Sequence, residues 1–216
     1  MMMTGIIGAA CERPAHAAGD LPKPEVDIAK GKEGEMRTMV VAAGCFWCVE
    51  GVFEKLAGVT DVISGYSGGS KETANYKAVC NGDTGHAEAV KITYDSSKIT
   101  YGELLRVFFT THDPTTKDRQ GPDRGTQYRS AIFFENAEQK KVAEAYIDLL
   151  NKSKAFESPV VTTLEPLTVF YEAELYHQNF VKNNPNHPYI MRFALPKVTK
   201  VKEKFADQVK KDEREK

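Results

Sequence analysis

The segment Gly44-Cys45-Phe46-Trp47-Cys48 constrains this chain most, because it places two thiols three positions apart directly after a glycine. An apolar run over residues 39–43 precedes it, and apolar side chains at helical spacing follow it, namely Val49, Val52, Phe53 and Leu56. The pattern predicts a strand, a glycine turn and a helix whose first turn carries both thiols. The N-terminus of a helix carries partial positive charge, which favours a thiolate. Cys45 is therefore the first candidate nucleophile, and Cys48 lies within reach for a disulfide.

Composition excludes several classes of protein. A chain of 216 residues suits one domain with tails. Its net charge of −1 argues against a nucleic-acid-binding surface. No stretch approaches the roughly 20 apolar residues that a membrane span needs. Four cysteines are too few for a disulfide scaffold in a chain of this length, so we expect their use to be catalytic or incidental.

The two ends of the chain differ from its centre. Scattered proline and glycine predict a flexible leader over residues 1–37, with a degenerate signal segment around Ala15-His16-Ala17. Cys11 after Ala9-Ala10 also resembles a lipoprotein cleavage site. We expect a cytoplasmic protein, or an exported one if the leader is a working signal. Residues 38–195 form the expected catalytic domain, and residues 196–216 a charged, exposed C-terminal helix.

Strand and helix patterns alternate through the centre of the chain, which makes α+β the expected class. A capping-box spacing, Thr100 to Glu103, marks the start of one helix. We expect strands over 37–44, 59–64, 86–94 and 127–134, helices over 46–57, 100–109, 137–151 and 173–181, extended runs over 160–163 and 167–170, a glycine-rich loop over 64–69 and a long loop over 111–125.

Glu88 stands out within the strand expected over 86–94. In a strand, side chains alternate between faces, so Glu88 shares one face with Val90, Ile92 and Tyr94. Burial on an apolar face raises the pKa of a carboxyl and favours its neutral form. A neutral carboxylic acid at pH 7 is what general-acid catalysis requires.

Four motifs taken together resemble the A-type peptide methionine sulfoxide reductases, the methionine-S-sulfoxide reductase family. The motifs are Gly44-Cys45-Phe46-Trp47-Cys48, Gly85-His86-Ala87-Glu88, Asp123-Arg124-Gly125-Thr126-Gln127-Tyr128-Arg129-Ser130 and Tyr171-Glu172-Ala173-Glu174-Leu175-Tyr176-His177-Gln178. The resemblance covers about residues 38–190. It implies a single-domain α+β fold, a two-layer α/β sandwich (a ferredoxin-like plait) with a mixed β-sheet.

The same resemblance implies an activity and a set of residues. The activity is reduction of the S epimer of methionine sulfoxide, free or in proteins, for the repair of oxidised proteins, with no metal and no bound cofactor. The residues implied are the nucleophile Cys45, the methyl-pocket residues Phe46 and Trp47, the substrate-positioning Asp123, and three groups around the sulfoxide oxygen, Glu88, Tyr76 and Tyr128.

Recycling of the oxidised nucleophile needs a second thiol. Many members of the family keep resolving cysteines in a C-terminal tail, but this chain has none after Cys80. Cys48 is therefore the expected resolver, since a Cys-x-x-Cys pair closes without large movement. Thioredoxin, or dithiothreitol in vitro, would then reduce the disulfide. We expect a monomer, with Cys80 a buried and inert thiol.

Two other functions stay open on the residues alone. A thiol–disulfide oxidoreductase would also use the strand–turn–Cys-x-x-Cys–helix order. A zinc-binding module would use Cys45, Cys48, Cys80 and His86, although Cys80 and His86 are a poorly spaced ligand pair.

Overall fold

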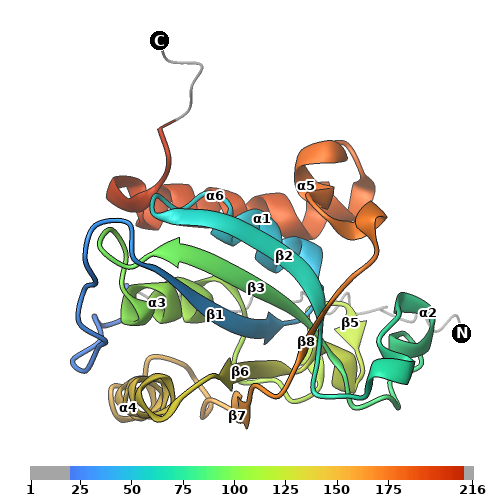
Figure 1. Ribbon diagram of the computed structural model, residues 1–216, viewed down its shortest axis with the longest axis horizontal. Helices are drawn as coiled ribbons and strands as arrows, with labels where there is room; N and C mark the ends of the chain where they lie inside the picture. The colour runs from blue at the N-terminus through green and yellow to red at the C-terminus, as the bar shows by residue number, and fades with distance from the viewer. Residues whose placement is uncertain (1–19, 212–216) are drawn as a thin grey trace, which may run out of the picture.

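Six strands form one mixed sheet in the computed structural model, which describes residues 20–211. The strands are β1 (Met36–Ala43), β2 (Val59–Ser67), β3 (Ala87–Asp95), β6 (Ser130–Phe134), β7 (Thr163–Pro166) and β8 (Phe170–Glu172), and β4 (Arg119–Gln120) with β5 (Asp123–Arg124) makes a separate hairpin. The order across the sheet is β7-β6-β1-β3-β2-β8 (Figure 1). All neighbours are antiparallel except β6 and β7, which are parallel.

Helices cover one face of this sheet. They are α1 (Phe46–Phe53), α2 (Tyr76–Val79), α3 (Tyr101–Thr111), α4 (Ala137–Lys152), α5 (Phe180–Asn183) and α6 (Leu195–Lys204). Side chains of α1, α3, α4 and α6 join Met39 and Val41 of β1 in one core. The alternate residues of β1, Val40 and Ala42, face the other side, where small residues dominate and Leu167 and Phe170 pack over them. The expected α+β class and mixed sheet are confirmed.

The ends of the main elements follow from local chemistry. Thr100 and Glu103 form a complete capping box at the start of α3, as their spacing predicts. The Asn136 side chain accepts the N–H of Gln139 and starts α4. The expected helix over 173–181 is wrong as a single element, because Asn179 adopts a left-handed conformation with φ 54°. The chain there divides into a short turn, η3 (Leu175–His177), and α5.

The segment before β1 differs from the flexible leader expected over residues 1–37. From residue 20 it has no helix or strand, but Leu21 and Ile28 are buried in the core. The Tyr146 hydroxyl donates to Pro22 O at 2.9 Å, and Arg106 Nε donates to Leu21 O at 2.9 Å. Residues 21–28 are thus held against α3 and α4. The degenerate signal and Cys11 lie outside the described residues.

The C-terminal helix is less exposed than its charge suggests. Val198 and Val201 of α6 are buried against the core, and Phe205 follows them inward. Val209 then bridges to Leu56 beyond the end of α1. The apolar side chains at the predicted helical spacing therefore pack residues 198–209 onto the domain. Within residues 20–211, no helix has both the length and the apolar character to cross a bilayer.

Candidate active site

The turn between β1 and α1 presents the two thiols. Gly44 has φ 82°, and a Cβ there would lie 2.5 Å from Gln120 Cβ, so only glycine fits. Cys45 is the N-cap of α1, and the N–H of Cys48 donates to Cys45 O at 3.1 Å. Both thiols therefore share one turn. Cys45 is 8% exposed and Cys48 2% exposed.

Glu88 lies against the start of the same helix. It comes from the middle of the sheet, where β3 pairs it with Tyr66 of β2, and it is buried as the alternation predicts. Its Oε2 accepts the N–H of Phe46 at 3.0 Å. Burial raises the pKa of Glu88 to about 8, and the Phe46 hydrogen bond only partly opposes this. The site therefore holds a neutral carboxylic acid at pH 7, hydrogen-bonded to the residue that follows Cys45.

The two thiols titrate as a pair because Cys45 donates a hydrogen bond to Cys48. That bond lowers the pKa of Cys48 to about 7, and the Lys197 ammonium and the Tyr189 hydroxyl act in the same direction. Burial, followed by the hydrogen bond to Cys48, raises the pKa of Cys45. The expectation that the helix N-terminus biases Cys45 itself toward thiolate is thus wrong for the resting state. Within the pair, Cys48 therefore ionises more readily than Cys45.

Aromatic rings line the site beside the thiols. Trp47 is stacked on Phe180 with ring centroids 3.7 Å apart and planes at 7°. The indole Nε1 of Trp47 donates to His177 Nδ1 at 3.2 Å. His177 in turn packs against Phe46 at 4.9 Å and Tyr76 at 4.4 Å between ring centroids. These rings form an apolar wall that suits a methyl group.

Glu50 holds part of this wall in place from the far side of α1. The side chain is fully buried, and it accepts the N–H groups of Asn179 at 3.0 Å and Phe180 at 3.2 Å. Because Phe180 stacks on Trp47, these bonds set the position of the wall. Burial raises the pKa of Glu50 to about 7.

Tyr76 and Tyr128 approach Glu88 from two short helical turns. The N–H of Tyr76 donates to Glu174 Oε1 at 3.0 Å, which holds the start of α2. Tyr128 ends the turn η2 (Thr126–Tyr128). Burial raises the pKa of both hydroxyls, and the nearby Glu88 carboxyl adds to the effect in each. Both tyrosines therefore remain hydrogen-bond donors at every physiological pH.

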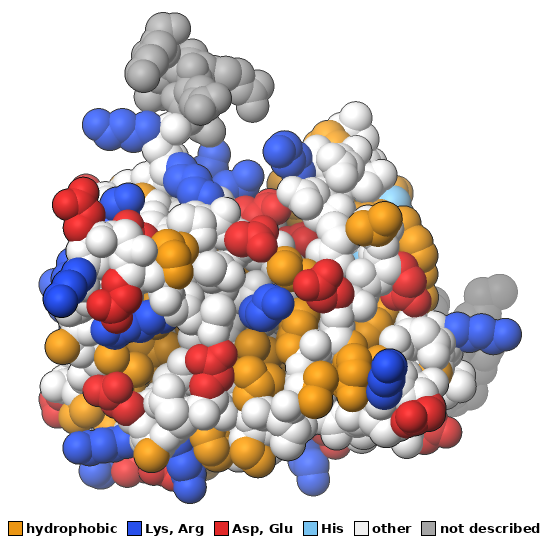
Figure 2. Space-filling model, in the orientation of Figure 1, with side chains coloured by type: hydrophobic (Ala, Val, Ile, Leu, Met, Phe, Trp, Pro, Cys, Tyr) orange, Lys and Arg blue, Asp and Glu red, His pale blue; other side chains and the backbone are white. Residues whose placement is uncertain are grey.

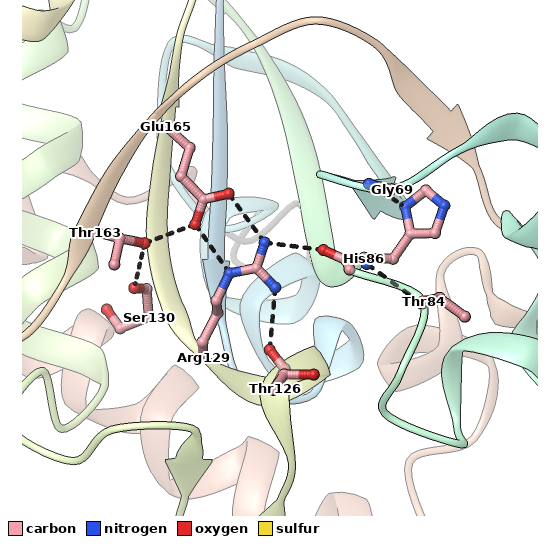
Figure 3. A network of polar contacts seen from close by, with 9 residues as sticks. Gly69, Thr84, His86, Thr126, Arg129, Ser130, Thr163 and Glu165 are labelled. Carbon is pink, nitrogen blue, oxygen red and sulfur yellow. Dashed lines mark hydrogen bonds and ion pairs between the residues drawn. The ribbon is translucent and has the colours of Figure 1, made fainter.

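Arg129, the residue after Tyr128, fastens this turn to the sheet. Its guanidinium makes a bidentate pair with Glu165 of β7, with Nε to Oε1 and Nη2 to Oε2 both 2.9 Å (Figure 3). The same Nη2 donates to Gly85 O at 3.2 Å, just before β3 begins. The ion pair is shielded, with side-chain exposures of 15% and 28%. Arg129 therefore fixes both the turn that ends in Tyr128 and the start of β3, which carries Glu88.

Asp123 lies on the Cys48 side of the site. Its Oδ2 accepts the hydroxyl of Tyr189 at 2.5 Å, and Tyr189 also hydrogen-bonds Cys48. Burial raises the pKa of Asp123, while Tyr189 and Lys197 lower it. Tyr189 and Lys197 are functional candidates that the sequence patterns miss. Tyr189 follows a segment that reads as a plain loop, and Lys197 lies in the charged helix expected over 196–216.

Cys80 differs from its sequence expectation, and His86 bears on the zinc-binding alternative. Cys80 is exposed rather than buried, and it hydrogen-bonds Tyr76. His86 Nδ1 accepts the N–H of Gly69 at 3.2 Å, and Nε2 bonds Ser70 O at 2.9 Å, so both ring nitrogens are used in the scaffold. In the part of the chain that the structure describes, no three His, Cys, Asp or Glu side chains gather into a group that could hold a metal ion. The arrangement expected of a zinc module is therefore not found there.

A buried thiol pair with a neutral carboxylic acid and an aromatic wall defines a thiol-dependent oxidoreductase. The chain belongs to the peptide methionine sulfoxide reductase family, whose model matches residues 37–209. The resemblance expected from the four motifs is thereby confirmed.

Curated relatives and solved structures agree. A peptide methionine sulfoxide reductase MsrA 2 from Synechocystis is 49% identical over 197 residues, which cover 88% of this chain and 90% of the relative. The MsrA 2 of Mesorhizobium japonicum is 54% identical over 169 residues, 78% of this chain and 87% of the relative. The reduced form of Mxr1 from Saccharomyces cerevisiae superposes with a TM-score of 0.63 at 35% identity, over 76% of this chain and 91% of that one. Methionine sulfoxide reductase A of Corynebacterium diphtheriae gives a TM-score of 0.63 at 31% identity, over 72% and 78%.

Proposed function

We propose that this reductase acts on the S epimer of methionine sulfoxide, in proteins and as the free amino acid, and repairs oxidised proteins. The observation that carries the proposal is the Glu88 carboxyl, which has a pKa of about 8 and is bonded to the first N–H of α1 next to Cys45. A sulfoxide oxygen must gain a proton as its bond to sulfur breaks. Glu88 is placed and protonated to supply it.

The chemistry balances with the groups present. The Cys45 thiolate attacks the sulfoxide sulfur, and Glu88 gives its proton to the oxygen as negative charge develops there. Hydrogen bonds from the Tyr76 and Tyr128 hydroxyls stabilise the same oxygen. Methionine leaves, Cys45 becomes a sulfenic acid and Glu88 a carboxylate. Cys48 supports the attack, because it accepts the Cys45 hydrogen bond and can take that proton.

Pocket residues then determine which sulfoxide is bound. We assign Phe46 and Trp47 to the substrate methyl group, because their rings form the wall next to Cys45. Asp123 orients the substrate from the opposite side, through the hydroxyl of Tyr189 that it binds. A chiral sulfoxide has its methyl group, oxygen and chain in fixed relation. Fixed sites for methyl and oxygen therefore accept one epimer.

Recycling uses Cys48. The Cys48 sulfur condenses with the Cys45 sulfenic acid, a disulfide forms and water leaves. Both sulfurs lie in one turn of α1 and are already hydrogen-bonded, so little movement is needed. Thioredoxin, or dithiothreitol in vitro, reduces the disulfide and is itself oxidised. We propose that the monomer is active and that no bound cofactor takes part. We also infer a ferredoxin-like plait at the centre of the fold, supported by the order β6-β1-β3-β2.

One experiment tests the whole proposal. The reduced protein is mixed with one equivalent of the S or the R sulfoxide, quenched, and its disulfides are mapped by mass spectrometry. We expect one equivalent of methionine from the S epimer only, and a Cys45–Cys48 disulfide. Methionine from the R epimer would contradict the stereochemical assignment. Reduction of insulin disulfides without turnover of either sulfoxide would favour a thiol–disulfide oxidoreductase instead.

A further inference from the structure

Two large hydrophobic side chains lie in the open at the edge of the proposed pocket. Leu175 is 90% exposed and Tyr176 62% exposed, and they are consecutive residues of η3. The next residue, His177, is 1% exposed and enters the aromatic wall. In the space-filling view, hydrophobic side chains gather at the edge of the molecule between α5 and α2 (Figure 2). One short turn therefore buries the His177 ring and exposes the side chains of Leu175 and Tyr176.

Hydrogen bonds from the side chains of Glu174 and Gln178 hold the backbone on both sides of this turn. The Gln178 side chain accepts the N–H of Ser64 at 2.9 Å and donates to the carbonyls of Ser64 and Ala173, each at 2.9 Å. Glu174, on the other side of the turn, accepts the Tyr66 hydroxyl at 2.8 Å and the N–H of Tyr76. The backbone that carries the exposed pair is thus preorganised, so binding a partner there costs little conformational entropy.

The exposed pair is continuous with the pocket. The Tyr176 ring packs on His177 with centroids 4.1 Å apart, and the opposite contacts of His177 are Phe46 and Tyr76. Ring contacts therefore lead in series from the exposed Tyr176 through His177 to Phe46, the residue after Cys45. When a methionine sulfoxide side chain occupies the pocket, the neighbouring residues of its polypeptide remain outside, along this edge.

We propose that Leu175 and Tyr176 bind the polypeptide that flanks the oxidised methionine, and that they favour substrates with an apolar side chain next to it. The inference deepens the proposed function and rests on it. It makes segments of oxidised protein with exposed apolar residues better substrates than the free amino acid, which is too short to reach the turn. Leu175 is 90% exposed and has no assigned part in the chemistry, so its substitution should leave the reaction itself intact.

The test compares three S-sulfoxide substrates with dithiothreitol as reductant. They are a blocked tripeptide with phenylalanine on both sides, the same tripeptide with serine on both sides, and the free amino acid. For Leu175→Ser we expect KM to rise roughly 3- to 10-fold for the phenylalanine tripeptide, the factor that partial burial of one leucine supplies. The kcat for that tripeptide, and all values for the other two substrates, should stay unchanged. Leu175→Met should restore the low KM, and Val26→Ser, a similarly apolar but remote surface change, should have no effect.

The outcomes separate this inference from the proposed function. Equal KM values for Leu175→Ser and the unaltered protein with the phenylalanine tripeptide would overturn the docking surface while leaving the reductase activity in place. A defect seen only when thioredoxin replaces dithiothreitol would overturn it too, and assign the turn to the reductant protein. Failure of the unaltered protein to reduce any S-sulfoxide would instead remove the proposed function.

Discussion

The Glu88 carboxyl accepts the N–H of Phe46, the residue that follows Cys45, so the proton donor and the nucleophile are tied to the same helical turn. The bond joins residues 42 positions apart, from the middle of the sheet to the start of α1. The hydrogen bond therefore holds the start of α1, with Cys45 as its N-cap, against β3.

Glu88→Gln should slow the reduction step by about 10²- to 10⁴-fold, because an amide keeps the size of the side chain but gives no proton. The measurement is the rate of methionine formation in a single turnover. Glu54→Gln, at the opposite end of α1, is the matched control and should react at the normal rate. A Glu88→Gln rate within a factor of three of the unaltered protein would mean that another group donates the proton.

The same substitution should change how stability depends on pH. The pKa of Glu88 is about 8 in the folded protein against an ordinary 4.5, so the folded state holds a proton that the unfolded state loses between those values. Its contribution to stability is complete below pH 4.5 and falls as pH rises to 8, by at most about 1.4 kcal/mol per pH unit. Urea unfolding at pH 5, 6, 7 and 8 should show the unaltered protein losing stability relative to Glu88→Gln. A constant difference between the two would contradict the raised pKa.

Cys48→Ser should complete one turnover and then stop when thioredoxin is the reductant, because the sulfenic acid on Cys45 has no partner thiol. Steady-state turnover and the single-turnover burst are measured on the same sample. Cys80→Ser is the control, and it should recycle normally. Steady-state turnover of Cys48→Ser that disappears only in the double variant with Cys80→Ser would identify Cys80 as the resolver.

Glu50→Gln should weaken substrate binding more than it slows chemistry. The N–H groups of Asn179 and Phe180 bind different oxygens of the Glu50 carboxyl, and glutamine replaces one of these oxygens with an NH2 group that cannot accept. The N–H left unpaired costs about 1–3 kcal/mol of stability. Loosening Phe180 also loosens the Trp47 stack, so we expect KM to rise while kcat stays within about twofold. Steady-state kinetics and urea unfolding check both effects, with Glu54→Gln again as control. A lowered kcat with an unchanged KM would contradict this assignment.

Gly44→Ala should be far more damaging than Gly34→Ala. Both glycines have positive φ, 82° and 76°, which costs a residue with a Cβ about 1–2 kcal/mol. Only at Gly44 would the new Cβ also meet a side chain, Gln120, whereas Gly34 faces open space. Urea unfolding of the two variants isolates the cost of that clash. Equal losses of stability would mean that the turn accommodates a methyl group.

Patterns within one segment account for most of what the sequence predicts. The alternation around Glu88, the capping box of α3 and the glycine turn before Cys45 each depend on neighbouring residues, and each is found in the structure. The contacts that the sequence misses join residues far apart in the chain. Trp47 and His177 are 130 positions apart, and Tyr189 meets Asp123 across 66. No local periodicity reports such contacts.

The pKa of Cys45 shows a second property that sequence patterns do not predict. Its position at a helix N-terminus is local and was predictable, but the burial that outweighs the helix charge depends on how β3, α2 and η2 close around it. The hydrogen bond from Cys45 instead lowers the pKa of the neighbouring Cys48, which the sequence predicts as the resolver, to about 7. The electrostatics of the pair therefore follow from packing rather than from spacing.

The packed segment before β1 bears on where this domain begins. The family match starts at residue 37, yet Leu21 and Ile28 fill the core and Asp27 accepts the N–H of Gly102 at 2.7 Å. A protein trimmed to the matched region would expose the side of α3 and α4 that these residues cover. The family model thus leaves out a segment that packs into the core, and the folded domain of this chain extends back at least to Leu21.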